Sequence, residues 1–256
     1  MRRAVAAPLA DLRAAPGGPL ERQYAYGEGL DLLERRDGWV RVRMDRDGLS
    51  GWTDVALGAE EAVTHRIATL SAHAYPEPDI KAPPAMRLPF GARIAAREGE
   101  AAGELGGGGA ARFVQAGAGW IPRAQLAPLG APAGDPVAVA ELFLGVPYLW
   151  GGDGPDGIDC SGLVQAALLA CGIACPADSD RQCAAFGAPP PAAPDELPRG
   201  ALLFWDGHVA MSRGDGSLIH ANAAAMAVSV EGIAPAIRRI SANGGGRLVA
   251  AGRPGR

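Results

Sequence analysis

The chain is poor in cysteine and in aromatic residues, with 4 Cys and 5% aromatic side chains among 256 residues. All the cysteines fall between residues 160 and 183 and include no Cys-x-x-Cys pair, which is a poor framework for cross-linking a chain of this length. We therefore expect free thiols in a reducing compartment. Because the spacing also lacks the paired rhythm of a zinc site, we expect no metal and no cofactor.

Long apolar runs and clusters of basic residues are missing as well. No segment reaches the roughly 18 uninterrupted apolar residues that a membrane-spanning helix requires. The apolar residues 4–7 are followed by Pro8, Asp11 and Arg13, too early for a secretory signal peptide. With 24 basic against 28 acidic side chains, and basic residues only singly or in pairs, the footprint of a nucleic-acid binder is missing. We expect a cytoplasmic protein without nucleic acid or membrane as a partner, and leave its oligomeric state open.

The 256 residues exceed the roughly 100 to 200 residues of a usual single domain, so several compact units are expected. Residues 24–57 alternate short apolar runs with turn signals such as Asp37-Gly38, a pattern typical of a small β-barrel. Residues 64–129 repeat this rhythm loosely. Residues 131–134 (Ala-Pro-Ala-Gly) are typical of a linker, after which the pattern becomes helical. We predict two β modules, residues 1–62 and 63–130, followed by a third domain over residues 131–256.

The third domain is predicted to contain helices first and strands later. Asp135 can cap a helix over residues 136–144, with Pro136 in its first turn. Apolar residues at helical spacing after Asp159, ended by Gly172, predict a second helix that begins almost at Cys160. Glycine-containing turns separate the predicted strands, which cover residues 201–205, 208–211 and 217–220.

Cys160 is the candidate nucleophile, because free N–H groups and the helix dipole favour a thiolate at the start of a helix. A nucleophilic cysteine needs a base, and of the 4 histidines only His208 and His220 fall in the same domain. A turn of three or five residues between their strands would pair positions 210 and 220 and make the histidines diagonal neighbours on one face. A turn of even length would separate them, leaving a core His220 and a surface His208 as the alternatives. The spacing thus permits a Cys-His-His relay.

Several segments resemble known families. Residues 147–152 (Pro-Tyr-Leu-Trp-Gly-Gly) and 157–165 (Gly-Ile-Asp-Cys-Ser-Gly-Leu-Val-Gln) resemble the nucleophile signature of the NlpC/P60 family. Residues 207–211 and 218–222 resemble the segments that supply its base and third polar residue. The resemblance implies a papain-like α+β domain, with the cysteine helix packed on an antiparallel sheet. The pairs Gly38-Trp39 and Gly51-Trp52 in the first module, and Gly119-Trp120 in the second, resemble bacterial SH3-like modules.

The resemblance implies a cysteine peptidase of the γ-D-glutamyl-L-diamino acid endopeptidase or dipeptidyl-peptidase VI type. Its substrate would be a peptidoglycan stem peptide, cleaved between D-glutamate and diaminopimelate or lysine. By the same resemblance, Cys160 attacks the γ-carbonyl, His208 moves the proton and His220 orients His208. Tyr148 adds an oxyanion donor, unless it is a core aromatic residue.

Substrate binding is implied for Asp159, Ser161, Asp178 and Ser179, which lie where the family binds the D-glutamate and the group before it. Asp178, together with Glu28 of the first module, would bind the free amine of L-Ala. The modules would then act as a gate for trimmed murein peptides, as in cytoplasmic cell-wall recycling. The alternative for Glu28 is a solvated turn residue. The alternative functions are an amidase or acyltransferase on the same fold, a hydrolase of intact peptidoglycan, and a non-catalytic wall-binding protein.

Overall fold

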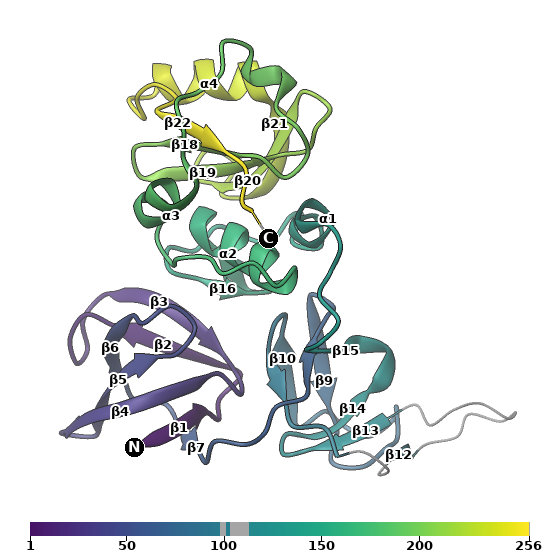
Figure 1. Cartoon of the computed structure of the whole chain (residues 1–256). Helices are drawn as coiled ribbons and strands as arrows, with labels where there is room; N and C mark the ends of the chain where they lie inside the picture. Colours follow the sequence, from purple (N-terminus) through teal and green to yellow (C-terminus); the bar gives the residue numbers. More distant parts are fainter. Residues whose placement is uncertain (98–100, 103–112, 256) are drawn as a thin grey trace, which may run out of the picture. The chain divides into compact units, whose positions relative to one another are not determined.

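The computed structural model describes residues 1–97, 101–102 and 113–255 and divides into two compact units, Met1–Ala131 and Pro132–Arg256 (Figure 1). The division falls within one residue of the boundary predicted between residues 130 and 131. Within the described ranges, none of the helices combines the length and the apolar character that crossing a membrane requires. Each unit is described by itself below.

The N-terminal unit is almost entirely β-structure, in keeping with the predicted SH3-like region. Its elements are β1 (Arg2–Val5), β2 (Leu9–Arg13), β3 (Leu20–Ala25), β4 (Gly29–Arg36), β5 (Trp39–Met44), β6 (Ser50–Thr53), β7 (Leu57–Gly58), β8 (His65–Ile67), β9 (Ser71–Ala74), β10 (Met86–Pro89), β11 (Arg93–Ile94), β12 (Ala101–Ala102), β13 (Phe113–Ala116), β14 (Gly119–Pro122), the short 3-10 helix η1 (Arg123–Gln125) and β15 (Leu126–Pro128).

Strands β1 to β7 form one seven-stranded sheet in the order β3-β2-β6-β5-β4-β1-β7. In β5, Val40, Val42 and Met44 are buried while Arg41 and Arg43 are exposed, as the two-residue period of a strand requires. The inward side chains pack with those of β2, β3 and β4 into one core. The alternating apolar pattern of the sequence therefore forms a half-buried sheet.

The later strands form three small sheets around a second core, to which the first sheet contributes Ala25. Ala25 of β3 packs with Ile67, Leu88 and Ile121. The backbone N–H of Arg93 donates to the Tyr26 carbonyl over 2.8 Å, and a side chain at residue 27 would overlap the Arg93 carbonyl oxygen at 2.0 Å. Gly27, with φ +76°, is therefore required where the two groups of strands meet.

The C-terminal unit is an α+β domain, as predicted, with helices on both faces of an antiparallel sheet (Figure 1). Its elements are α1 (Pro136–Glu141), β16 (Asp153–Gly154), β17 (Gly157–Ile158), α2 (Cys160–Ala170), α3 (Ser179–Phe186), the short 3-10 helix η2 (Pro194–Glu196), β18 (Leu202–Trp205), β19 (His208–Ser212), β20 (Ser217–Asn222), β21 (Ala227–Gly232), α4 (Ile233–Ala242) and β22 (Ala250–Gly252).

The five strands of the main sheet have the order β21-β20-β19-β18-β22. Helix α2 contacts β19 and β20, the two central strands that carry the candidate histidines. Helix α4 covers the other side, where its Ile233, Ala236 and Ile240 pack against Leu203, Leu218 and other buried side chains of the sheet. The chain therefore places the start of α2 and the strands of His208 and His220 in one packed unit.

The first predicted helix has the expected cap but is shorter than predicted. Asp135 accepts a hydrogen bond from the Val137 N–H over 2.9 Å, and Pro136 occupies the first turn. The α-helix ends at Glu141, since the next three N–H groups bond to carbonyls three residues back rather than four. This tighter turn continues to Leu144, where the predicted helix ended.

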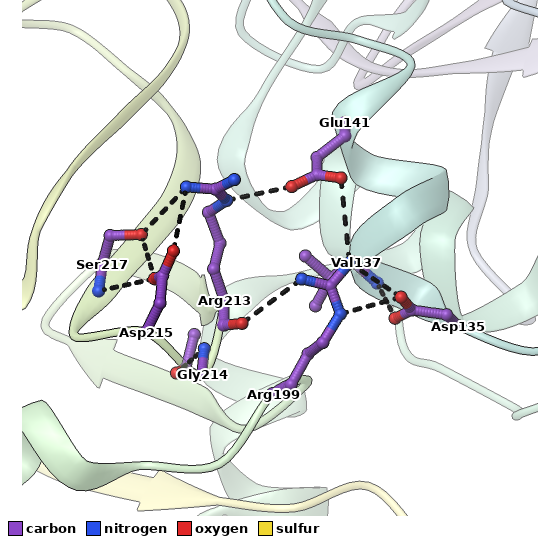
Figure 2. Close-up of polar contacts among 9 residues, drawn as sticks. Asp135, Val137, Glu141, Arg199, Arg213, Gly214, Asp215 and Ser217 are labelled. Carbon is purple, nitrogen blue, oxygen red and sulfur yellow. Dashed lines mark hydrogen bonds and ion pairs between the residues drawn. The ribbon is translucent and has the colours of Figure 1, made fainter.

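Charged side chains fasten α1 to the turn between β19 and β20 (Figure 2). The Arg199 guanidinium binds Asp135 at 2.7 Å and lies 3.7 Å from Glu141. Arg213 binds Glu141 at 2.9 Å and also contacts Asp215 in the turn. These pairs are partly exposed, so we attribute a small stabilisation to each of them.

Candidate active site

Cys160 is the first residue of α2, and the residue before it fixes the start of the helix. Asp159 Oδ1 accepts from the Gly162 N–H at 2.6 Å and from the Ser161 hydroxyl at 3.1 Å. Its Oδ2 accepts from the Gly151 N–H at 2.9 Å. One carboxylate therefore caps the helix and holds the Tyr148-containing loop against it, which positions Cys160 at the end of the helix that favours a thiolate.

The loop of residues 147–152 packs closely around the same helix start. A side chain at residue 152 would lie 2.5 Å from the Gly157 carbonyl oxygen, so only glycine fits there. The Tyr148 N–H donates to the Met226 carbonyl over 2.9 Å. Partial burial, and then the nearby Cys160 and Asp159, raise the pKa of Tyr148 to about 12. Tyr148 therefore keeps its proton at neutral pH, and its hydroxyl can donate a hydrogen bond.

The two candidate histidines are hydrogen-bonded to each other. His208 begins β19 and His220 lies within β20, and the Nε2 of His208 is 2.9 Å from the Nδ1 of His220. The pairing of Met211 with Ile219, continued by one residue, sets Ala210 opposite His220. The predicted diagonal arrangement is therefore confirmed, because the turn has odd length.

Burial keeps both imidazoles neutral near pH 7. The pKa of His208 is well below its usual value, first because of burial and then because His220 and Arg239 are near. Burial likewise lowers the pKa of His220, although Glu231 acts in the opposite direction. A neutral His208 has one unprotonated ring nitrogen, which is the form that a general base requires.

The structure also places two charged residues beside the histidines that the sequence did not indicate. The Nε2 of His220 lies 2.9 Å from Oε1 of Glu231, and Glu231 is bound by the guanidinium of Arg239. In β21 the apolar residue Val230 is 37% exposed, while the neighbouring acid Glu231 faces His220. This inversion of the usual strand pattern was the signal in the sequence that could have indicated Glu231.

A hollow of about 340 Å³ opens beside His208. Its lining includes polar groups from the β18–β19 turn, from the end of β20 and from α4 and the residues after it. The polar lining residues are Asp206, His208, Asn222, Arg239 and Asn243. The candidate base therefore faces open space rather than a filled core.

The predicted substrate-binding residues of the C-terminal unit divide into two groups. Asp159 and Ser161 are buried and hydrogen-bonded to each other, as described above. Asp178 and Ser179 are partly exposed at the start of α3, which Gln182 joins to α2 by donating to the Ser161 carbonyl over 3.0 Å. Binding of substrate by these four residues stays a prediction.

Glu28 lies in the N-terminal unit and is 3% exposed, so the alternative of a solvated turn residue is wrong. Its Oε1 accepts from the Ala25 N–H at 3.1 Å and from Arg46 at 2.9 Å. The carboxylate is thus part of an internal ion pair, which its sequence context did not indicate. Its part in a substrate gate stays a prediction.

The C-terminal unit thus belongs to the class of papain-like α+β domains, with a cysteine at a capped helix start and a histidine pair on the sheet. Residues 145–238 match the model of the NlpC/P60 family, and residues 12–56 match that of the bacterial dipeptidyl-peptidase Sh3 domain. The chain therefore carries an NlpC/P60 domain behind a bacterial dipeptidyl-peptidase SH3 domain. The predicted resemblance to the NlpC/P60 family is confirmed, and the predicted SH3-like resemblance is confirmed for the first module. For the second module, residues 63–130, it stays a prediction.

Individual proteins match over parts of the chain or at low identity. A probable endopeptidase of Mycobacterium bovis is 40% identical over 102 residues, which cover 38% of this chain and 26% of the relative. A γ-D-glutamyl-L-lysine dipeptidyl-peptidase of Bacillus cereus is 34% identical over 106 residues, covering 38% of this chain and 31% of the relative. The crystal structure of an NlpC/P60 family protein from Bacillus cereus superposes with a TM-score of 0.76 over 99% of both chains at 19% identity, a likeness of fold.

Proposed function

We propose that this protein is a cysteine peptidase that hydrolyses the γ-D-glutamyl–diamino acid bond of peptidoglycan stem peptides. The observation that carries the proposal is Cys160 at a capped helix start, in a helix packed on the strands that hold the 2.9 Å pair of His208 and His220. Support comes from the NlpC/P60 match and from the relatives named γ-D-glutamyl-L-lysine dipeptidyl-peptidase.

In the proposed reaction His208 acts twice, first as a base and then as an acid. His208 takes the proton of the Cys160 thiol, and the thiolate attacks the γ-carbonyl carbon of D-glutamate. The N–H groups at the start of α2 and the Tyr148 hydroxyl stabilise the resulting oxyanion. His208 then gives its proton to the leaving amine of the diamino acid, and water hydrolyses the thioester to regenerate the thiol.

We further propose that the preferred substrate is a trimmed murein peptide with a free N-terminal L-Ala, used in cytoplasmic cell-wall recycling. An acid at Asp178 and the second matched domain, of the dipeptidyl-peptidase type, support a preference for a free amine. A reducing compartment is consistent with the four cysteines, all among the described residues, none of which forms a disulfide.

The test is hydrolysis of L-Ala-γ-D-Glu-diaminopimelate by the wild type, by Cys160→Ala and by the control Cys183→Ala, with released diaminopimelate followed by mass. Loss of the nucleophile should lower the rate roughly 1,000-fold or more, while the control keeps the wild-type rate. Equal rates for the wild type and Cys160→Ala would contradict the proposed nucleophile. No hydrolysis by the wild type would exclude this peptidase activity and leave acyl transfer or binding.

The preference for a free amine is tested with the N-acetylated tripeptide and with intact sacculi. We expect fast cleavage of the free tripeptide, slow cleavage after acetylation and little release from sacculi. Equal rates before and after acetylation would exclude the gate, and fast release from sacculi would indicate a wall hydrolase. Fractionation of the native cells by immunoblot tests the cytoplasmic location.

A further inference from the structure

The pair of His208 and His220 is extended by two charged side chains from neighbouring elements. Oε1 of Glu231, in β21, lies 2.9 Å from Nε2 of His220, although the two groups are not aligned as in a linear hydrogen bond. Arg239 of α4 donates from its Nε to Oε2 of Glu231 over 3.3 Å and also contacts Oε1. Four side chains from four elements thus form one continuous row that ends at the candidate base.

The sheet register explains why these groups meet. His220 pairs with Ser229 and Leu218 pairs with Glu231, so the four residues lie on one face of β20 and β21. Leu218 packs in the core that α4 covers, which brings Arg239 of that helix over the same face. The row is buried at His220, whose side chain is 0% exposed, and partly exposed at Glu231 and Arg239, whose side chains are 24% and 31% exposed.

The direction of the hydrogen bonds follows from the charge on Glu231. The pKa of Glu231 is lowered, because Arg239 and His220 outweigh the effect of partial burial. An ionised carboxylate only accepts, so it favours the proton of His220 on Nε2. The Nδ1 of His220 then accepts from the Nε2–H of His208, which leaves the Nδ1 of His208 without a proton.

We propose that Glu231 and Arg239 are positioning residues of this site: Glu231 sets the tautomer of His220 and thereby the nitrogen with which His208 accepts a proton, and Arg239 holds Glu231 in place. The inference rests on the proposed peptidase function and deepens it. Glu231 acts through His220, whereas Arg239 acts through Glu231 and also lies near His208, on the lining of the hollow. Arg239 also lies just beyond residues 145–238, the segment that matches the family model.

Glu231 and Arg239 should shift the pKa of the histidines in opposite directions. Around His220, His208 faces it from β19, Glu231 from β21 and Arg239 from α4, while Cys160 begins α2, which contacts both histidine strands. Asp206 lines the hollow next to His208. The negative Glu231 favours the protonated imidazole and the positive Arg239 opposes it, so their removal shifts the histidine titration in opposite directions.

Kinetics with matched controls test the proposal. Glu231→Gln should lower kcat about tenfold, the equivalent of one pKa unit, with KM within about twofold, and should move the acid limb of the pH–rate profile to lower pH. Arg239→Gln should move the acid limb to higher pH. The controls Glu196→Gln and Arg238→Gln make the same chemical changes at exposed positions of the same unit and should keep wild-type profiles. Acid limbs that move in the same direction, or that do not move in an active enzyme, would overturn the proposal.

Imidazole ¹⁵N NMR of the full chain separates this inference from the peptidase assay, because it needs no turnover. In the wild type, His220 should carry its proton on Nε2 and His208 should have an unprotonated Nδ1. In Glu231→Gln the His220 signals should move towards a mixture of tautomers, while Glu196→Gln leaves them unchanged. A wild-type His220 protonated on Nδ1 would overturn the proposal even in an active enzyme, and the expected tautomers in an inactive chain would leave the positioning intact while excluding the proposed function.

Discussion

Two acid–arginine pairs, one in each unit, differ in how deeply they are buried and in what surrounds them. In the N-terminal unit the side chains of Glu28 and Arg46 are 5% and 7% exposed, and Arg46 also lies over the Tyr24 ring at 4.5 Å. In the C-terminal unit Glu231 and Arg239 are 24% and 31% exposed, and Glu231 contacts His220.

The comparison separates the two ion pairs by the groups that surround them. Around Glu28 the structure places the Ala25 N–H and Arg46, and Arg46 in turn contacts Asp47 and lies over the Tyr24 ring. Burial also raises the pKa of Tyr24. The first pair therefore joins parts of the barrel, whereas the second pair contacts the imidazole of His220, whose proton can move.

The largest effect on stability is expected at the more deeply enclosed pair. Arg46→Met removes the guanidinium that binds Glu28 at 2.9 Å and lies 3.6 Å from Asp47 inside the barrel, and we expect a loss of about 3 to 5 kcal/mol in the free energy of unfolding. Denaturant unfolding of the full chain measures it, with the exposed Arg41→Met as control. A loss no greater than that of the control would mean that the pair is replaceable by apolar packing.

A fall in pH should lower the stability of the C-terminal unit around His220 and leave that of the N-terminal unit unchanged. His220 has a pKa of about 4 in the folded chain against an ordinary value of 6.5, so the unfolded chain binds protons more readily between these values. Stability should therefore fall as pH drops from about 6.5 to about 4, on the order of 1 kcal/mol per pH unit. Protection factors from hydrogen exchange should decrease for β19 and β20 and not for β4 and β5. An equal decrease in both regions would contradict this assignment.

The smallest effect is expected at an exposed pair of the same type. Asp135 and Arg199 are in contact at 2.7 Å with side chains 39% and 42% exposed (Figure 2). Arg199→Gln should cost less than about 1 kcal/mol, since water solvates both charges. The midpoint of denaturant unfolding measures this, and a loss as large as that of Arg46→Met would contradict the ranking by burial.

The sequence predicted those features that depend on local chemistry. Asp135 was recognisable as a helix cap, and the apolar spacing after Asp159 was enough to predict a helix that begins near Cys160. Whether His208 lies beside His220 depended on the length of the turn, which the sequence left open between odd and even. Glu28 and Arg46 could not be paired in advance, because their contact depends on how the barrel closes. Likewise, only the helix phase of α4 decides that Arg239, and not its exposed neighbour, reaches the sheet.

The start of α2 has a further consequence for the chemistry of sulfur. Its N–H groups favour any negative charge placed at Cys160, and this includes the sulfenate and sulfinate anions that form when a thiolate is oxidised. The sulfinate is not reduced by ordinary thiols. The helix end that would activate the candidate nucleophile would thus also stabilise its oxidised anions, so we expect peroxide to inactivate this site.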